Sequence, residues 1–600
     1  MAVPKTAALP LGDTPVMTLQ RLCMRCKLSS KSSFFTIFSA SFFISKHENF
    51  LFFVTGTRFA NRVRLITSAA CGEFRRSPLH DNFKMYTYQA GCSIFARIQY
   101  IMYIVHIASE LAPVAKVGGL GDVTLGLCRE LSWKEHDVDL ILPKYDCMDS
   151  DTIRDLAIDT PELLSYYEGE WFSNTIWMGW VENMKVYFIE PHHPSYLFNR
   201  GCFYGCDDDI DRYAYFSRAA LEFLSQKQPQ PDIIHLHDWQ TALVAPLYKE
   251  IFSKEGFDNP KIVFTIHNIE YQGKCAPFNL DRVGLDGTEM LDAAKMQDSY
   301  SPDTINLLKG AIVYSDFVTT VSPNYASEVL TPIGGRGLDP VLQKYKDKFM
   351  GILNGIDYSY WNPETDHYLP SHFSSREIPL NKQDRHTLDK KALIKKTLRE
   401  QLDLEQTHCP IVGCVTRLVP QKGLDLIKHT IEYTLQHGGQ FVLLGSTPIP
   451  SINAEFHALQ RKYAENGKVH FTLHSDEGQA HTIFAASDMF IVPSLFEPCG
   501  LTQMISLKYG SIPIVRKTGG LADTIVDVDY SGRPFEETNG YVFDHPDKSG
   551  IESALDRAFD CWFHNPSRWR QLVVHGMNID FSRTKPTEKY VEVYTKLRGS

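Results

Sequence analysis

The sequence lacks any apolar run long enough to cross a bilayer, which takes about 18 residues or more. The nearest candidate, Phe34–Ile44, spans about 11 residues and is followed by the charged residues Lys46 and Glu48. We therefore expect no membrane span. With 43% hydrophobic and 22% charged residues, the composition also excludes wholesale disorder, a collagen-like repeat and a coiled-coil rod.

Cysteine is too sparse for a disulfide scaffold, with 13 in 600 residues, an odd number. Cys23 and Cys26 form a Cys-x-x-Cys pair, but no second pair or histidine cluster follows at the spacing of a zinc site. Cys202 and Cys206 are equally isolated. We therefore expect a reducing compartment and free, mostly structural thiols.

Positive charge is scarce outside the first hundred residues. Residues 1–100 contain 13 Lys and Arg against four acidic residues, a net charge of +9, whereas the whole chain carries −10. The other 500 residues therefore carry −19. Because nucleic acid is bound through Lys and Arg that neutralise phosphates, we expect no nucleic-acid partner.

The N-terminal segment has the composition of a targeting sequence. Residues 1–47 hold six basic residues, seven serines between 29 and 45, and one acid, Asp13. A basic, hydroxyl-rich and acid-poor segment is typical of organelle transit peptides. The aromatic run at 34–43 also fits the core of a signal peptide, and disordered or mistranslated sequence is a third interpretation. We predict a transit-like or disordered segment over residues 1–95 and a plastid location, with the cytoplasm as the alternative.

From residue 101 onwards, short apolar runs alternate with segments of helical spacing. The first series of runs covers residues 103–108, 138–142, 232–236, 261–266 and 317–321. The second series covers residues 411–415, 440–444, 469–473, 489–492, 512–515 and 541–543. Runs rich in β-branched residues and separated by helices predict parallel sheets that are covered on both faces.

A polar stretch without strand patterns separates the two series, between Asn362 and His408, and it ends in a charged helical segment at Lys390–Leu402. The sequence therefore predicts an α/β fold of two Rossmann-like parallel-sheet lobes that face an interlobe cleft. We place the lobes at residues 101–361 and 385–580, with a linker at 362–384.

One short pattern, K-x-G-G-L-x-D, occurs twice, at Lys116–Asp122 and at Lys517–Asp523. A Gly-Gly turn that opens a helix exposes backbone N–H groups at the positive end of the helix, which suits phosphate. Tight turns needed only for packing are the alternative. Neither copy is G-x-G-x-x-G, so a nicotinamide dinucleotide is disfavoured.

The ends of the predicted strands are unusually polar, and ligands of open parallel sheets bind at those ends. Polar residues follow seven strand ends and include Glu110, Asp238, His267, Asn354, Arg417, Ser446 and Glu497. Their common placement predicts an active site between the lobes. Arg417 and Lys422 lie in one short loop, where a guanidinium and an ammonium suit a diphosphate, although a solvated surface loop is the alternative. The carboxylates of Glu110, Asp238 and Glu497 suit sugar hydroxyls or a positive charge that develops during the reaction.

These segments, together with E-P-C-G-L-T-Q at Glu497–Gln503, closely resemble the bacterial glycogen synthase and plant starch synthase family. Members of this family are retaining GT-B glycosyltransferases that use ADP-glucose. The resemblance runs from about Tyr103 to Lys596 and is greatest with the fourth class of plant starch synthases. The features that carry the latter likeness are Pro143–Met148, Tyr215–Leu221 and Glu270–Gly273.

The resemblance implies a role for each matching residue. Arg417 and Lys422 are expected to hold the diphosphate and stabilise the departing ADP. Glu497 is expected to contact the glucose hydroxyls, and His267 is expected to bond the region of the 6-hydroxyl. Asp238 is expected to lie near the acceptor and the anomeric centre. Further residues expected to bind ADP-glucose are Lys116, Gly118, Gly119, Asn268, Asn354, Cys499, Gly500, Leu501, Thr518, Gly519 and Gly520. The resemblance also implies that residues 581–600 form a helix that returns to the N-terminal lobe.

The implied reaction is transfer of glucose from ADP-glucose to the non-reducing end of an α-1,4-glucan, starch or glycogen, with retention of configuration. We expect the acceptor hydroxyl to attack from the face that ADP leaves, with the phosphate taking the proton. Asp238 as a glycosidase-type nucleophile is the alternative. Other interpretations are an inactive glucan-binding homologue, and a GT-B enzyme of different specificity such as a sugar-nucleotide epimerase or a UDP-glucose transferase.

Two clusters invite a metal interpretation. Asp207–Asp209 fits the D-x-D of metal-dependent transferases, but it also heads a helix, where acids complement the dipole. His235 and His237 share one strand face, as in some zinc hydrolases, but buried, hydrogen-bonded histidines are the favoured interpretation. Because Arg417 and Lys422 already supply positive charge, we expect neither a metal nor a cofactor.

Overall fold

The computed structural model describes residues 101–257, 260–380 and 390–599, together with the backbone of seven strands before residue 101. The chain divides into two units, Met1–Met102 and Tyr103–Ser600. In the first unit, β1 (Leu22–Cys23), β2 (Ser39–Ile44), β3 (Asn49–Thr55), β6 (Tyr86–Gln89) and β5 (Arg75–Arg76) form one antiparallel sheet, and β4 (Val63–Thr67) pairs with β7 (Ala96–Tyr100). The targeting hypothesis for residues 1–95 concerns a segment that lies mostly outside the described residues.

The first lobe of the second unit contains a nine-stranded sheet of order β10-β11-β12-β9-β8-β13-β14-β17-β18. From β12 onwards, each neighbouring pair is parallel. Five of these seven strands were predicted, whereas β12 and β18 were not. The parallel strands are β8 (Tyr103–Ile107), β9 (Asp137–Pro143), β12 (Met184–Pro191), β13 (Ile233–His237), β14 (Lys261–Ile266), β17 (Phe317–Thr320) and β18 (Phe349–Gly351). The helices are α1 (Gly119–Trp133), α2 (Asp209–Gln226), α3 (Val244–Glu250), α4 (Phe278–Asp281), α5 (Gly287–Met290), α6 (Leu307–Tyr314), α7 (Pro323–Glu328) and α8 (Asp339–Lys344).

The antiparallel extension of this sheet was not predicted from the sequence. There, β10 (Arg154–Tyr167) pairs with β11 (Glu170–Val181), which pairs with β12. Most of β10 is exposed or half-buried, so it lacks the continuous apolar run of the buried parallel strands.

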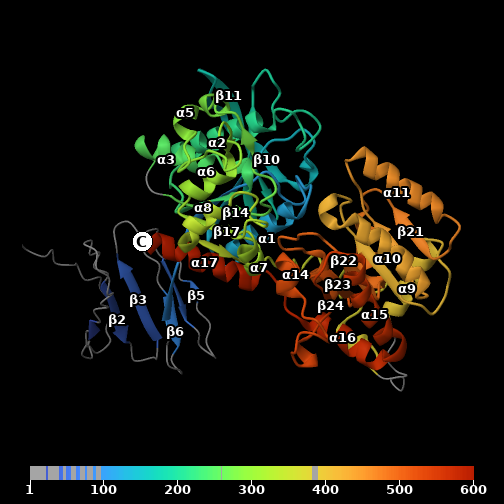
Figure 1. The fold of residues 1–600 in the computed structure, drawn as a ribbon. Helices are drawn as coiled ribbons and strands as arrows, with labels where there is room; N and C mark the ends of the chain where they lie inside the picture. Colours follow the sequence, from blue (N-terminus) through green and yellow to red (C-terminus); the bar gives the residue numbers. More distant parts are fainter. Residues whose placement is uncertain are drawn as a thin grey trace, which may run out of the picture. The chain divides into compact units, whose positions relative to one another are not determined.

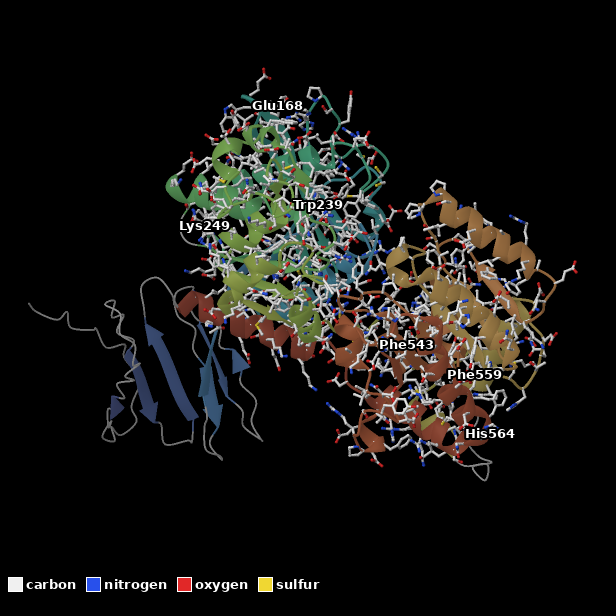
Figure 2. The ribbon with its side chains drawn as sticks, in the orientation of Figure 1. Glu168, Trp239, Lys249, Phe543, Phe559 and His564 are labelled. Atoms are coloured by element: carbon white, nitrogen blue, oxygen red, sulfur yellow. The ribbon has the colours of Figure 1, made fainter. Side chains whose placement is uncertain are left out.

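The second lobe contains a six-stranded parallel sheet of order β21-β20-β19-β22-β23-β24, whose six strands were all predicted. They are β19 (Ile411–Val415), β20 (Gln440–Leu444), β21 (Val469–Thr472), β22 (Met489–Val492), β23 (Ile512–Arg516) and β24 (Tyr541–Phe543). The helices are α9 (Lys390–Gln401), α10 (Leu424–Gln436), α11 (Pro450–Lys462), α12 (Glu477–Ala486), α13 (Thr502–Lys508), α14 (Gly519–Thr524), α15 (Lys548–His564) and α16 (Pro566–Asn578). Phe543 and Phe559, marked in Figure 2, belong to its buried core.

The C-terminal helix α17 (Thr584–Gly599) lies against the first lobe. The Tyr594 hydroxyl lies 2.7 Å from Nδ1 of His235 on β13, and Lys134, just after α1, forms an ion pair with Glu588. Figure 1 shows α17, in red, beside the first lobe rather than with α15 and α16. No helix among the described residues is both long and apolar enough to span a bilayer.

Candidate active site

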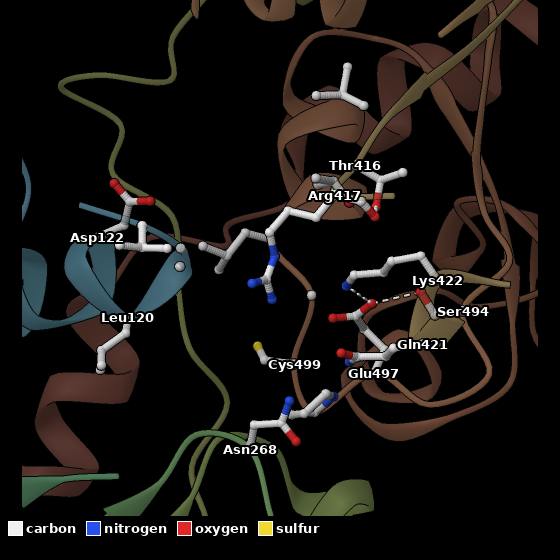
Figure 3. A pocket seen from close by; sticks show the side chains of 18 of the residues that line it. Leu120, Asp122, Asn268, Thr416, Arg417, Gln421, Lys422, Ser494, Glu497 and Cys499 are labelled. Carbon is white, nitrogen blue, oxygen red and sulfur yellow. Dashed lines mark hydrogen bonds and ion pairs between the residues drawn. The ribbon is translucent and has the colours of Figure 1, made fainter. Parts of the chain in front are cut away.

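A cavity of about 740 Å³ lies between the two lobes, at the carboxyl ends of their strands. It is lined by 13 of the 16 residues that the sequence analysis assigned to catalysis or donor binding, and Figure 3 shows part of this lining. These residues are Lys116, Gly118, Gly119, Asp238, His267, Asn268, Asn354, Arg417, Lys422, Glu497, Cys499, Gly500 and Leu501. The predicted interlobe site is therefore present as a geometric feature.

Lys422 and Glu497 form an ion pair on the wall of this cavity. Lys422 Nζ lies 2.6 Å from Oε2 of Glu497, and the Ser494 hydroxyl donates to the same oxygen at 2.7 Å. Both charged side chains are largely buried. Figure 3 shows the second carboxylate oxygen turned toward the cavity, where a ligand hydroxyl can reach it.

Arg417 is placed differently from Lys422. It follows β19 and its guanidinium points into the cavity in Figure 3. No carboxylate of the described residues lies within ion-pair distance of it. The wall thus offers one cation that is held by a carboxylate and one that is available to an anionic ligand.

The first K-x-G-G-L turn is already occupied by a carboxylate of the protein. Oε2 of Glu110 accepts hydrogen bonds from the backbone N–H groups of Val117 and Gly118, each at 2.9 Å. Tyr204 donates to the other oxygen of Glu110 at 2.8 Å, and Lys116 pairs with Asp122 at 3.0 Å. The backbone N–H groups of the turn therefore bind an anion, as predicted, but that anion is the carboxylate of Glu110.

The second turn does not line the cavity. Its backbone N–H at Gly519 donates to Oε1 of Glu328, at the end of α7 in the first lobe, at 2.8 Å, and the Thr518 hydroxyl also contacts that carboxylate. A Cβ at Gly519 would lie 1.9 Å from the carbonyl oxygen of Glu497, and one at Gly520 would lie 2.1 Å from that of Cys499. These glycines allow close packing behind the Glu497 loop, and the assignment of Thr518, Gly519 and Gly520 to the donor stays a prediction.

Asp238 has a strained backbone, with φ of 57° and ψ of −177°, a region that only glycine adopts readily. Its Oδ1 accepts hydrogen bonds from the backbone N–H of His267 at 2.6 Å and of Asn268 at 3.3 Å. Burial raises the pKa of Asp238 to about 7, against the lowering effect of those two hydrogen bonds. Strain of this kind is concentrated at functional sites.

Four histidines lie together on the first-lobe side of the cavity, where His267 lines it and the other three are buried. His237 is hydrogen-bonded through Nε2 to Nδ1 of His106 and through Nδ1 to Nε2 of His267, each at 3.0 Å. His235 contacts Tyr594 and the Thr265 hydroxyl. Burial lowers the pKa of His106 and of His267 to about 3, and those of the other two well below the usual value.

The histidine cluster offers little to a metal ion. Candidate ligand atoms of His106, His235 and His237 lie within 4.8 Å of one another. However, both ring nitrogens of His235 and His237 are hydrogen-bonded, and Nε2 of His106 is the ring nitrogen of the three that lacks a partner among the described residues. The interpretation of His235 and His237 as hydrogen-bonded core residues is confirmed.

The Asp207–Asp209 segment also has other partners. Asp208 pairs with Arg200 at 2.6 Å, and Asp209 pairs with Arg212 at 2.5 Å and accepts from the Gly205 N–H. Since α2 begins at Asp209, the segment heads a helix as predicted.

The cavity contains several residues that were not predicted, including Asp122, Tyr204, Trp239, Tyr271, Glu477 and Thr502. Thr502 follows the predicted Leu501, and Trp239 follows the predicted Asp238. Both could therefore have been predicted from the motifs that they adjoin. Tyr204 was not predictable from local pattern, because its contact with Glu110 joins residues 94 positions apart. Glu477 begins α12, and its interaction with His481, whose Nε2 lies 3.8 Å from Oε1 of Glu477, lowers its pKa to about 2.

Comparisons with known proteins agree with this geometry. Residues 103–344 match the family model of the starch synthase catalytic domain, and residues 395–571 match that of glycosyl transferases group 1. Glycogen synthase of Protochlamydia amoebophila is 66% identical over 493 residues, covering 82% of this chain and 99% of that protein. The probable starch synthase 4, chloroplastic/amyloplastic, of Arabidopsis thaliana is 50% identical over 498 residues, covering 82% of this chain and 47% of that protein.

Solved structures extend the comparison to three dimensions. The catalytic domain of starch synthase IV from Arabidopsis thaliana, bound to ADP and acarbose, matches with a TM-score of 0.80 and 50% identity, covering 83% of this chain and 100% of that chain. A sucrose-phosphate synthase from Thermosynechococcus elongatus matches with a TM-score of 0.51 at 18% identity, which shows a shared fold alone.

Two parallel-sheet lobes around an interlobe cavity of this kind define a glycosyltransferase of the GT-B fold. Within that class, the chain belongs to the family of glycogen synthases and starch synthases.

Proposed function

We propose that this protein transfers glucose from ADP-glucose to the non-reducing end of an α-1,4-glucan with retention of configuration. The observation that carries the proposal is the cavity wall on which Arg417 points inward beside the Lys422–Glu497 pair. Support for the donor comes from the starch synthase IV domain, which is 50% identical and was solved with ADP and acarbose.

Charge separation in the reaction explains why these residue types are needed. When the bond between C1 of glucose and the phosphate oxygen breaks, positive charge develops on the sugar and negative charge on ADP. Arg417 and Lys422 stabilise the diphosphate as it leaves, and placed cations of this kind act mostly in the transition state. The second carboxylate oxygen of Glu497, which is turned toward the cavity, accepts a hydrogen bond from a glucose hydroxyl and so fixes the sugar against the cations.

The acceptor hydroxyl attacks C1 from the face that ADP leaves, and a phosphate oxygen takes its proton. His267 and Asn268 contact the glucose, and the turn at Lys116–Gly119 approaches it from the first lobe, near Leu501 of the second. Asp238 has its Oδ1 engaged by two backbone N–H groups, and we assign it to stabilising the sugar near the anomeric centre rather than to covalent attack.

A donor comparison tests this proposal. Incorporation of labelled glucose into a glucan primer is measured with ADP-glucose and with UDP-glucose at equal concentration. We expect incorporation mainly from ADP-glucose. No incorporation from either donor would favour an inactive glucan-binding homologue, and a preference for UDP-glucose would contradict the donor assignment.

We also propose that the N-terminal segment delivers the enzyme to a plastid, on the strength of its basic, serine-rich composition. The catalytic unit begins at Tyr103, the first residue of β8 and of the match to the starch synthase family model. A fluorescent fusion of residues 1–100 tests delivery, and diffuse cytosolic fluorescence would contradict it. A chain lacking residues 1–95 is expected to remain active, and insolubility would show that part of the segment supports the fold.

A further inference from the structure

Three histidines form a diagonal row across neighbouring parallel strands of the first lobe. His106 on β8 lies in register with His235 on β13, and His237 on β13 lies in register with Thr265 on β14. His237 is two residues beyond His235, and His267 is two residues beyond Thr265. Because side chains two residues apart share a face of a strand, His106, His237 and His267 lie on one face and step toward the cavity.

The hydrogen bonds along this row connect unlike nitrogens. Nδ1 of His106 meets Nε2 of His237, and Nδ1 of His237 meets Nε2 of His267. His106 and His237 are fully buried, whereas His267 lines the cavity. Since Nε2 of His267 is used within the core, Nδ1 is its nitrogen available to a ligand.

This connection forces the three rings to share one tautomer. Burial keeps the imidazoles neutral, so each ring carries one ring proton. Each hydrogen bond needs one proton between its two nitrogens. If His106 carries its proton on Nδ1, then His237 and His267 must do the same. If His106 carries it on Nε2, both others must follow.

We propose that His106 and His237 are positioning residues for glucosyl transfer, holding His267 in the tautomer that the three rings share and thereby setting whether its Nδ1 donates to or accepts from the sugar. The proposal rests on the proposed function, because the sugar is the ligand that His267 serves. Neither residue touches the ligand, and both act through the ring of His267.

His235 provides a matched control on the same face. It is as deeply buried as His106, and its ring lies 4.8 Å from that of His106 between centroids. Its hydrogen bonds go to Tyr594 of α17 and to Thr265 rather than into the row. Replacing it removes a buried histidine without breaking the connection to His267.

Solid-state ¹⁵N NMR of the full chain, labelled at the histidine ring nitrogens, tests the row directly and without substrate. We expect His106, His237 and His267 to show the same tautomer, each with one protonated and one bare nitrogen. Signals are assigned by their loss in single variants. Different tautomers within the row, or a doubly protonated ring at neutral pH, would overturn the proposal.

Three variants test the consequence for catalysis. His106→Leu breaks the row, and we expect a mixture of His267 tautomers and a fall in kcat of about 10- to 100-fold, as when the orienting partner of a functional histidine is lost, with a smaller change in KM. His106→Asn keeps a donor and an acceptor near the position of Nδ1 and is expected to recover most of kcat. His235→Leu should lower stability but leave the His267 tautomer and kcat close to those of the unmodified chain.

An unchanged kcat in His106→Leu, or an equal loss in His235→Leu, would contradict the positioning role. If His106→Leu does not fold, the NMR result on the unmodified chain still decides whether the row exists as described. If the unmodified chain transfers no glucose, the proposed function fails, and the shared tautomer is still measured independently.

Discussion

Lys422 Nζ and Glu497 Oε2 lie 2.6 Å apart on the wall of the interlobe cavity, so the cation and the carboxylate hold each other in place before any ligand binds. Ser494 fixes the same oxygen at 2.7 Å. The pair thereby presents a fixed ammonium and, in Figure 3, a second carboxylate oxygen that is turned toward the cavity. Preorganised charges of this kind need little rearrangement during the reaction.

Replacing Arg417 or Lys422 by Ala is expected to lower kcat by about 10²–10³, because each cation stabilises charge that develops on the leaving diphosphate. Glucan affinity should change little. Lys428→Ala is the control, since Lys428 on α10 pairs with the exposed Asp425 and with Glu455 and does not line the cavity. Steady-state kinetics with separately determined glucan binding provide the measurement. Near-normal kcat in both cavity variants would rule out this loop as the diphosphate site.

Asp238→Asn is expected to raise stability at neutral pH while lowering activity. The folded protein keeps the Asp238 proton up to a pKa of about 7, whereas the unfolded chain releases it near about pH 4. The unmodified protein therefore loses stability as the pH rises between these values, by at most about 4 kcal/mol. Because Asn carries no titrating proton, the variant does not lose this stability. Its free energy of unfolding should therefore rise relative to that of the unmodified chain between about pH 4 and 7.

Urea unfolding at several pH values checks the sign of this effect. Asp366→Asn serves as the opposite case, because hydrogen bonds from His481 and Tyr509 outweigh the effect of burial and lower the pKa of Asp366. That variant should lose stability at neutral pH. Parallel pH dependence of Asp238→Asn and the unmodified chain would show that Asp238 is not a buried, protonated group.

Gly519→Ala is expected to lower both stability and kcat. Gly519 has φ of +44°, and a Cβ there would lie 1.9 Å from the carbonyl oxygen of Glu497, so the Glu497 loop must move. Gly532→Ala is a control for backbone strain alone, since Gly532 has φ of +68° but open space around its Cβ position. Gly532→Ala should lower the free energy of unfolding by about 1–3 kcal/mol and leave kcat unchanged. Equal kcat in the two variants would contradict the packing role of the second turn.

Activity is expected to survive chelation by EDTA. Arg417 and Lys422 supply the positive charge that a metal ion provides in D-x-D transferases, and Asp208 and Asp209 are engaged by Arg200 and Arg212. Turnover is measured before and after EDTA, and again with Mn²⁺ or Mg²⁺. A loss of turnover that the metal restores would contradict the role of the two cations.

Most of the parallel strands were predictable because burial on both faces demands continuous β-branched and aliphatic runs, although β12 and β18 were missed. β14, β19, β20, β22 and β24 have the predicted bounds. β10 was not predictable in this way, because a half-exposed antiparallel strand mixes polar and apolar residues and depends on pairing with β11. Most of the residues predicted from the strand-end motifs and the first K-x-G-G-L turn line the cavity, since strand ends of one parallel sheet share an edge, but they form only part of its wall.

The two K-x-G-G-L turns show what sequence similarity alone misses. In both copies, backbone N–H groups donate hydrogen bonds to a carboxylate, which is that of Glu110 in the first turn and that of Glu328 in the second. Glu328 lies 191 residues from Gly519, so nothing near the motif indicates its presence. The position of the second turn relative to the cavity is set by the packing of α7 against α14, and the K-x-G-G-L pattern contains no information about that packing.

The configuration of the first product tests the central claim most directly. ADP-glucose labelled with ¹³C at C1 is mixed with a malto-oligosaccharide, and the linkage is read by NMR within the first turnovers. The account predicts an α-1,4 linkage at the non-reducing end, formed together with one equivalent of ADP. A β linkage, or labelled free glucose without elongation, would contradict it.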